Sequence, residues 1–253
     1  MTKNQWKAFC EYREKMKNCC ENWLKFSNQL EYLQKKAAEI DTPPYPLETA
    51  VVYNRAYDEI CEEDEINLIV IGDNPGKDEQ LKKNNKYLVG QSGKIAAGFF
   101  AKNPELKTDF RKNVIIMNKT PVHTAKTKHL KFLIKNGGDE IKNLIEESQK
   151  LMAIMASNLH QRLIENCTPN SVVPQLWLIG YSELKTNGIF SLYRDSLKSS
   201  YTDDFAWDKV FVYQHFSMNR FLVDLKNFKK LNPEKNFSEA LNDLGHLHRD
   251  EIF

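Results

Sequence analysis

The residues of this chain best suited to catalysis follow an apolar segment. Asp73 and Asn74 come directly after the run Ile66–Ile71, inside the sequence GDNPG of Gly72–Gly76. A sharp turn uses Gly, Asn or Pro, but it does not need an Asp beside the Asn. A carboxylate can act as a general base, and a carboxamide offers a donor and an acceptor together. The pair therefore indicates chemistry at the end of this segment.

Three further apolar segments also end in polar side chains. They are Asn113–Met117 followed by Asn118–His123, Gln175–Ile179 followed by Gly180–Ser182, and Val210–Tyr213 followed by Gln214–Arg220. Ligands of open α/β sheets bind where parallel strands end. A single Asn after a strand is often only a turn former, and a single His is usually structural. The joint occurrence favours one active site at one edge of a sheet.

The segments that must position these residues alternate between two periodicities. Short apolar runs predict four strands, at Asn67–Ile71, Asn113–Met117, Gln175–Ile179 and Val210–Tyr213. Intervening amphipathic stretches predict helices at Ser92–Ala101, with Ser92 as N-cap, at Asp139–Asn166 and at Asn219–Phe228. Strands separated by helices imply right-handed crossovers. We therefore predict a three-layer αβα fold with a central four-stranded parallel sheet.

The first 45 residues have a different pattern. Residues 3–38 contain no Gly or Pro, and their aromatic and apolar residues recur at helical spacing. This predicts one long helix, or two, ended by the stiff connector Thr42–Pro46. We divide the chain into a helical extension, 1–45, and an α/β domain, 46–253. The aromatic face is expected to pack into the core rather than to bind a partner.

Composition excludes several classes of protein. The 253 residues include 36 basic and 34 acidic side chains, a net charge of +2, which argues against a whole-chain polyanion binder but leaves room for a local basic face. Five cysteines without a C-x-x-C pair predict free thiols in a reducing cytoplasm. The polar N-terminus and the lack of an apolar run of about 20 residues predict no signal peptide and no membrane span. We expect a soluble cytoplasmic protein.

Four segments, taken in order, resemble the motifs of the uracil-DNA glycosylase superfamily. They are Gly72–Gly76, similar to G-x-[Asp/Asn/Ala]-P; Leu88–Gly93, similar to F-V-G-x-x-G; Val114–Asn118, similar to a strand closing in Asn; and His215–Ser217, similar to H-P-S. The resemblance covers about residues 66–228. It implies an enzyme that flips a damaged base out of DNA and hydrolyses its N-glycosidic bond. The substrate would be uracil or a related deaminated base, and no cofactor or metal would be needed.

The resemblance also assigns roles to residues. Asp73 and Asn74, weighted equally, would position or activate water, and His215 would donate to the leaving base oxygen. Asn118 would pair with the edge of the base, while Met218 or Arg220 would be the wedge inserted into the duplex. The remaining substrate-binding positions are Tyr87, Leu88, Gly90, Ser92, Gly93, Ser217 and Asn219. DNA would be the partner, with no membrane contact, and we expect a monomer.

Several alternatives remain open. The basic, hydroxyl-rich segment Lys119–His129 fits a phosphate-contacting loop and an ordinary solvated loop equally well. His246 and His248 are interpreted as surface residues rather than metal ligands. A non-catalytic nucleic-acid-binding member of the same fold is the second functional hypothesis. A small-molecule hydrolase is the third, ranked lower because no Walker loop, G-x-S-x-G or H-E-x-x-H motif occurs.

Overall fold

A computed structural model describes residues 1–169 and 171–253. Its centre is one parallel sheet in the order β2-β1-β3-β4. The strands are β1 (Leu68–Gly72), β2 (Val114–Asn118), β3 (Gln175–Ile179) and β4 (Val210–Tyr213). The register pairs Gly72 with Asn118 and Ile71 with Leu178. The predicted four-stranded parallel sheet is confirmed, each strand within one residue of its predicted bounds.

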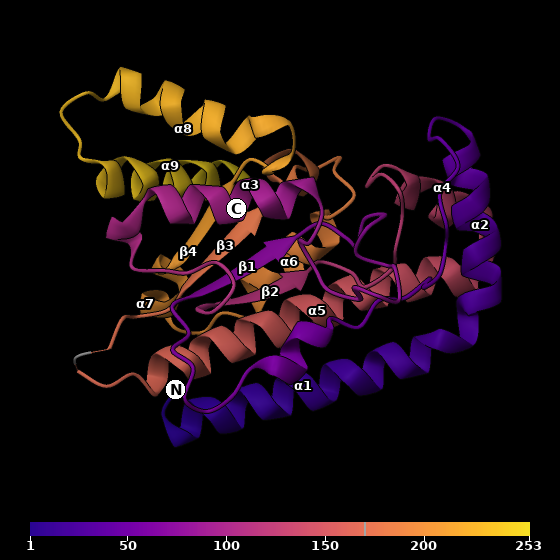
Figure 1. Ribbon diagram of the computed structural model, residues 1–253, viewed down its shortest axis with the longest axis horizontal. Coiled ribbons are helices and arrows are strands. Elements are labelled where there is room, and N and C mark those ends of the chain that lie inside the picture. The colour runs from indigo at the N-terminus through magenta and orange to yellow at the C-terminus, as the bar shows by residue number, and fades with distance from the viewer. Residues whose placement is uncertain (170) are drawn as a thin grey trace.

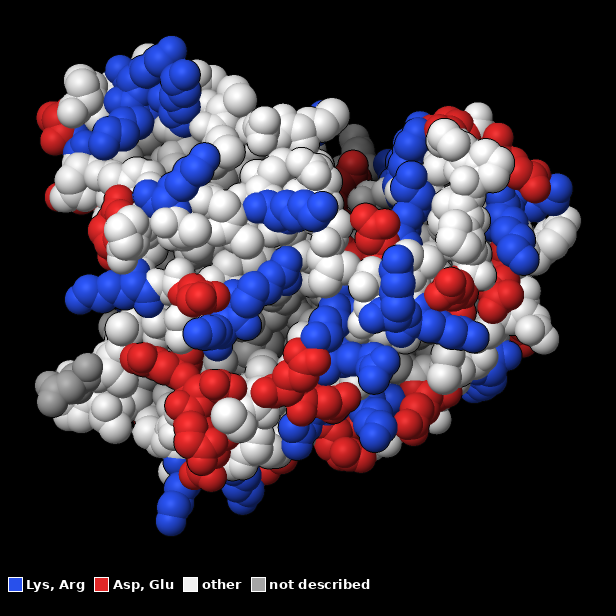
Figure 2. Space-filling model, viewed as in Figure 1, with Lys and Arg blue, Asp and Glu red and all other residues white. Residues whose placement is uncertain are grey.

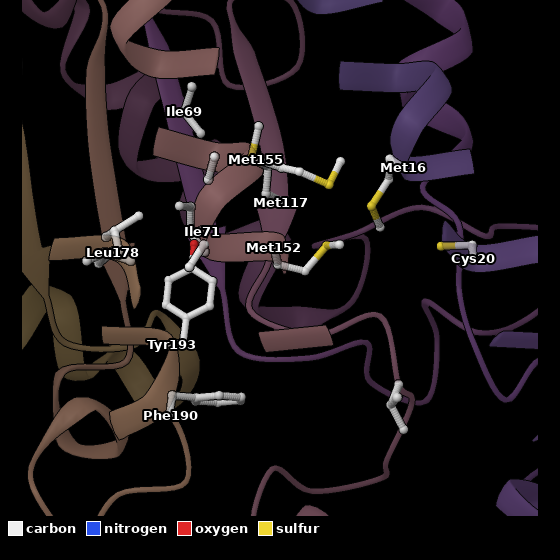
Figure 3. Packing of buried hydrophobic residues seen from close by; sticks show 14 of the residues in the cluster. Met16, Cys20, Ile69, Ile71, Met117, Met152, Met155, Leu178, Phe190 and Tyr193 are labelled. Carbon is white, nitrogen blue, oxygen red and sulfur yellow. The ribbon is translucent and has the colours of Figure 1, made fainter. Parts of the chain in front are cut away.

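The strands are apolar throughout because both faces of the sheet are covered. Side chains alternate between two hydrophobic clusters. Ile69 and Ile71 face one cluster with Met152 and Met155, and Figure 3 shows these side chains beside Met117. The alternate strand residues, such as Val70 and Trp177, face a second, more aromatic cluster.

The helices complete three layers (Figure 1). They are α1 (Lys3–Trp23), α2 (Ser27–Glu39), α3 (Gln91–Lys102), α4 (His129–Asn136), α5 (Gly138–Glu165), α6 (Ser191–Ser199), α7 (Asp204–Asp208), α8 (Arg220–Leu231) and α9 (Phe237–Ile252). Helices α3, α8 and α9 cover the aromatic face of the sheet, and α5, flanked by α1 and α6, covers the other. The predicted αβα architecture is therefore confirmed.

The N-terminal segment forms two helices joined by a short 3₁₀ turn, Leu24–Phe26. Thr2 starts α1 with a capping box, in which its hydroxyl accepts from the N–H of Gln5 and the Gln5 side chain accepts in return. Phe9 and Met16 are buried in the cluster that also contains Ile69 and Ile71. The aromatic face of these helices thus packs into the core, as the sequence predicts.

One local prediction needs correction. Helix α3 begins at Gln91 rather than after Ser92, and Gly90 takes the N-cap position. The N–H of Lys94 already donates to the carbonyl of Gly90, so Ser92 lies inside the first turn and cannot cap the helix. Helices α4, α6, α7 and α9 lie in segments for which no helix is predicted, although Asn236 and Glu239 form a capping box at the start of α9. None of the described helices has both the length and the apolar character needed to cross a membrane.

Candidate active site

The sheet order creates a crevice between two strands. Along the chain β1 leads to β2 on one side, and β3 then returns to the other side of β1. The C-terminal ends of β1 and β3 therefore border a topological switch point, where ligands of α/β proteins bind. Asp73 follows β1 directly, and Gly180 follows β3.

A pocket of about 190 Å³ opens at this crevice. Segments that follow all four strands contribute to its wall. The lining residues are Asp73, Thr127, Gly180, Ser182, Glu183, Gln214, His215, Ser217 and Arg220. Of the candidate site residues, the structure thus brings Asp73, His215, Ser217 and Arg220 together around one cavity.

Asp73 forms an ion pair inside the protein. The Nζ atom of Lys119 lies 2.6 Å from Asp73 Oδ1 and also donates to the carbonyl of Ile179 at 2.5 Å. The Lys119 side chain is completely buried. Burial lowers the pKa of its ammonium group, and the charge of Asp73 opposes that shift. Lys119 itself therefore faces inward and cannot contact a phosphate. The phosphate-contact hypothesis for the segment Lys119–His129 is left to Lys126 and Lys128, which are exposed and form ion pairs with Asp41.

The first half of that segment is not a solvated loop either, whereas Lys126 and Lys128 further along are exposed. The hydroxyl of Thr120 lies 2.7 Å from that of Ser148, and His123 is bound on both ring nitrogens, by Pro75 O and by the hydroxyl of Tyr45. Thr120 and His123 are both fully buried. The segment instead packs against the turn after β1 and places the Thr127 hydroxyl in the pocket.

Gly180 makes room for the Asp73 carboxylate. Its φ of +101° lies in the left-handed region, and a Cβ atom at this position would lie 2.4 Å from Asp73 Oδ1. Glycine is therefore required here both for the backbone conformation and for the close approach of the carboxylate.

We expect Gly180→Ala to lower the free energy of unfolding by at least about 2 kcal/mol, because the left-handed conformation and the contact with Asp73 are both unfavourable. Urea denaturation measures this change. Gly98→Ala is the matched control: Gly98 lies inside α3, and a Cβ there meets nothing within 4 Å. That control should raise stability by about 0.5–1 kcal/mol. Equal effects of the two substitutions would contradict the role given to Gly180.

His215 is held in a defined neutral tautomer. Burial lowers its pKa, opposed by the charge of Asp73 and assisted by those of Lys119 and Arg220. The backbone N–H of Ser217 donates to Nδ1 at 3.0 Å, and the Ser217 hydroxyl lies 2.7 Å from the same atom. Because Nδ1 accepts, the proton is on Nε2. Nε2 has no protein partner within the described ranges, so its N–H remains available to a ligand in the pocket.

The loop after His215 is anchored at one point and exposed at the next. Phe216 is fully buried, and its ring centroid lies 4.8 Å from that of Phe221. Met218 and Asn219 both have left-handed backbone conformations, with φ of +53° and +56°. The Met218 side chain is 72% exposed. The loop therefore presents an apolar side chain to solvent beside the pocket.

Asn74 lies outside the pocket lining. Its Nδ2 donates to the carbonyl of Val122 at 3.1 Å and to the hydroxyl of Thr124 at 2.8 Å. These bonds tie the turn after β1 to the segment that follows β2. Geometry thus separates two residues to which the sequence gave equal weight, since only Asp73 faces the pocket.

Several other candidate substrate residues lie on the β2 side of β1. Asn118, Tyr87 and Leu88 are each at most 4% exposed, and none lines the pocket. The Tyr87 hydroxyl donates to Val52 O at 2.6 Å, and Asn118 Nδ2 is buried without a partner among the described residues. The space beside Gly93 is used internally, because a Cβ there would lie 1.4 Å from the carbonyl oxygen of Leu88.

Comparisons with protein-family models, with curated proteins and with solved structures found no match for this chain. The function is therefore inferred from the site and from the motif resemblance.

Glu79 is a buried acidic residue that sequence reasoning missed. Its carboxylate accepts from the backbone N–H groups of Gly76, at 3.2 Å, and Leu88, at 3.0 Å. Burial raises its pKa to about 7. It lies in the polar stretch KDEQLKK (77–83), which is typical of an exposed loop, so composition gave no sign of its burial. Glu79 joins the turn that carries Asp73 to the segment that carries Leu88.

The raised pKa of Glu79 makes the free energy of unfolding depend on pH. The folded state holds this proton up to about pH 7, whereas the unfolded chain releases it near pH 4.5. Its contribution to the free energy of unfolding is therefore full below about pH 4.5 and falls by about 3 kcal/mol as the pH rises through 7. We expect Glu79→Gln to remove this fall, as measured by urea denaturation at pH 5 and pH 8. The exposed neighbour variant Asp78→Asn should keep the fall of the wild type. A stability difference between Glu79→Gln and wild type that is constant with pH would contradict the assignment.

Further polar groups complete the pocket. The Gln214 carboxamide and the Ser182 hydroxyl line it, and neither side chain has a hydrogen bond within the described part of the chain. Both follow predicted strands, but sequence alone gave them no role.

Across residues 1–169 and 171–253 no group of three or more His, Cys, Asp or Glu side chains is arranged to hold a metal ion. His246 Nε2 contacts the carbonyl of Asp208 at 2.9 Å. The prediction that His248 is a surface residue is wrong, because His248 is buried with its Nε2 3.5 Å from Asp224 Oδ2.

Proposed function

We propose that this protein hydrolyses the N-glycosidic bond of uracil, or of a related deaminated base, in DNA. The observation that carries the proposal is that the Asp73 carboxylate and the neutral imidazole of His215 both line one pocket. The pocket lies at the sheet edge where α/β proteins bind ligands. Four motif-like segments in the order of the uracil-DNA glycosylase superfamily add support.

The two side chains suit the two demands of the reaction. The sugar becomes oxocarbenium-like as the bond breaks, and negative charge grows on an oxygen of the departing base. A carboxylate stabilises the positive sugar and can accept a proton from the attacking water. The Nε2–H of His215 can donate to the base oxygen, and one such donor in a dry site contributes about 3–4 kcal/mol to the transition state.

The pocket also offers groups that could recognise the base. A carboxamide pairs with a neighbouring N–H and C=O, the pattern on the edge of uracil and other deaminated bases. The resemblance gives this task to Asn118, but Gln214 is the carboxamide that lines the pocket beside His215. We therefore assign edge recognition to Gln214 in this conformation.

The helix that begins at the pocket, α8, carries basic side chains suited to a phosphate backbone. Helix α8 starts with Arg220 at the pocket and carries Lys226, Lys229 and Lys230 further along. None of these four forms an ion pair among the described residues. Figure 2 shows basic side chains gathered over the C-terminal end of α8, the end opposite to Arg220, while charges of both signs are mixed elsewhere on this face. Together with exposed Met218 as a wedge, this surface would hold a bent duplex.

The direct test is an excision panel. Oligonucleotides carrying uracil, hypoxanthine, xanthine or a thymine mispair, single- and double-stranded, are incubated with the protein, and abasic sites are detected by alkaline cleavage. We expect release of at least one deaminated base. No release from any of them, with salt-sensitive binding intact, would replace the proposal with the non-catalytic nucleic-acid-binding alternative. If the protein neither releases a base nor binds the oligonucleotides, the result would favour a small-molecule substrate.

A further inference from the structure

Lys119 is an unusual residue for the interior of a protein. Its side chain is completely buried, and its ammonium group lies 5.0 Å from the ring centroid of Phe190. A buried ion pair often contributes little net stability, because the loss of hydration offsets the attraction. Its position beside the pocket therefore points to a role in the site.

The contacts of Lys119 decide which oxygen of Asp73 faces the pocket. Nζ binds Asp73 Oδ1 and Ile179 O, with Gly72 O at 3.4 Å. An ammonium group has three protons, and these acceptors use all three. Oδ1 is thereby fixed on the inner side. Oδ2 keeps only the hydroxyl of Thr127, at 3.4 Å, and Thr127 is itself a pocket residue.

We propose that Lys119 is a positioning residue that holds Asp73 by Oδ1 and so directs Oδ2 toward the substrate. The inference rests on the proposed function, because it concerns the carboxylate assigned there to the sugar and the water. Lys119 itself does not touch the substrate. The acceptors come from the ends of β1 and β3, and Lys119 follows β2, so three strands fix one carboxylate.

The test is Lys119→Met, which keeps most of the length of the side chain and removes the charge. Misplacement of a reacting group by about 1 Å can lower a rate about 100-fold, so we expect kcat to fall by about that factor with little change in KM. The other titratable groups facing the pair are Glu183, His215 and Arg220, and they are unchanged in this variant.

Two comparisons separate positioning from a purely structural role. Lys36→Met removes a surface ion pair on α2 and should leave kcat and KM unchanged. D73N/K119M removes both charges and should unfold at a higher temperature than Lys119→Met alone, without regaining activity. A Lys119→Met enzyme with the wild-type kcat and KM would overturn the inference, even if the variant were less stable.

A measurement that needs no catalysis covers the remaining outcomes. Carbon-detected NMR can compare the chemical shift of the Asp73 carboxyl carbon in the wild type and in Lys119→Met at one neutral pH, and we expect this chemical shift to change in the variant and to stay the same in Lys36→Met. If Lys119→Met does not fold, Lys119→Gln takes its place. An unchanged chemical shift would overturn the control of Asp73 by Lys119. A changed chemical shift in a protein that releases no base would refute the proposed function and leave that control standing.

Discussion

Asp73→Asn is expected to lower kcat for base release by about 10³-fold, the largest effect of any single substitution in the pocket. The amide has nearly the shape of the carboxylate but carries no charge to stabilise a positive sugar and cannot accept a proton from water. Binding of the intact oligonucleotide should change little, because DNA is held mainly through its phosphates. Single-turnover rates and equilibrium binding, measured on the same uracil-containing duplex, separate the two effects.

Asn74→Ala provides the internal comparison for Asp73→Asn. The Asn74 carboxamide is engaged by Val122 and Thr124 and lies outside the pocket lining. Its removal should lower stability by about 1–3 kcal/mol and leave most of the activity. If Asn74→Ala abolished release while Asp73→Asn did not, the assignment of Asp73 as the reacting group would be wrong.

His215→Ala is expected to lower kcat by about 10²–10³-fold, because the pocket loses its donor to the base oxygen. Analogues whose leaving base is a better leaving group should be affected less, since they need less stabilisation of negative charge. The pH dependence of the wild-type activity provides a second test of this role. Burial lowers the pKa of His215, so the neutral form persists below the usual value of 6.5. The wild type should therefore keep its activity as the pH falls through 6.5.

A sharp loss of wild-type activity at pH 6.5, absent from His215→Ala, would contradict the neutral imidazole. Ser217→Ala is an informative companion, because the backbone N–H of Ser217 still donates to Nδ1 when its hydroxyl is removed. That variant should keep the tautomer and most of the rate.

The sheet could be predicted because its strands are buried on both faces. Leu68–Gly72 and Gln175–Ile179 are apolar runs bounded by polar turns, a pattern that local sequence carries by itself. Strand order could not be predicted in the same way, because it depends on which strands pair in space. Nothing in the local sequence of β1 indicates that β3 pairs with it. Helix α9 follows α8 with no strand between them, so strand–helix alternation does not indicate it.

The site was predictable to the level of strand ends and no further. Asp73 and His215 follow strands, and parallel strands end at one edge, so their approach follows from topology. The direction in which each side chain points does not follow from topology. Lys119 reads as part of a basic loop, yet it is buried, and Asn118 ends β2 but lies across β1 from the pocket. These outcomes depend on tertiary packing, to which neighbours in sequence contribute little.

The complete burial of Lys119 has a consequence for chemical labelling. Among the lysines of the described ranges, Lys119 is the one whose side chain is buried from solvent. Amine-reactive reagents and acetylating enzymes can reach a primary amine only when solvent can, so the folded protein should acquire adducts elsewhere and spare this position. Mass spectrometry of Lys119 would then report how often the ends of three strands separate, without any substrate being present.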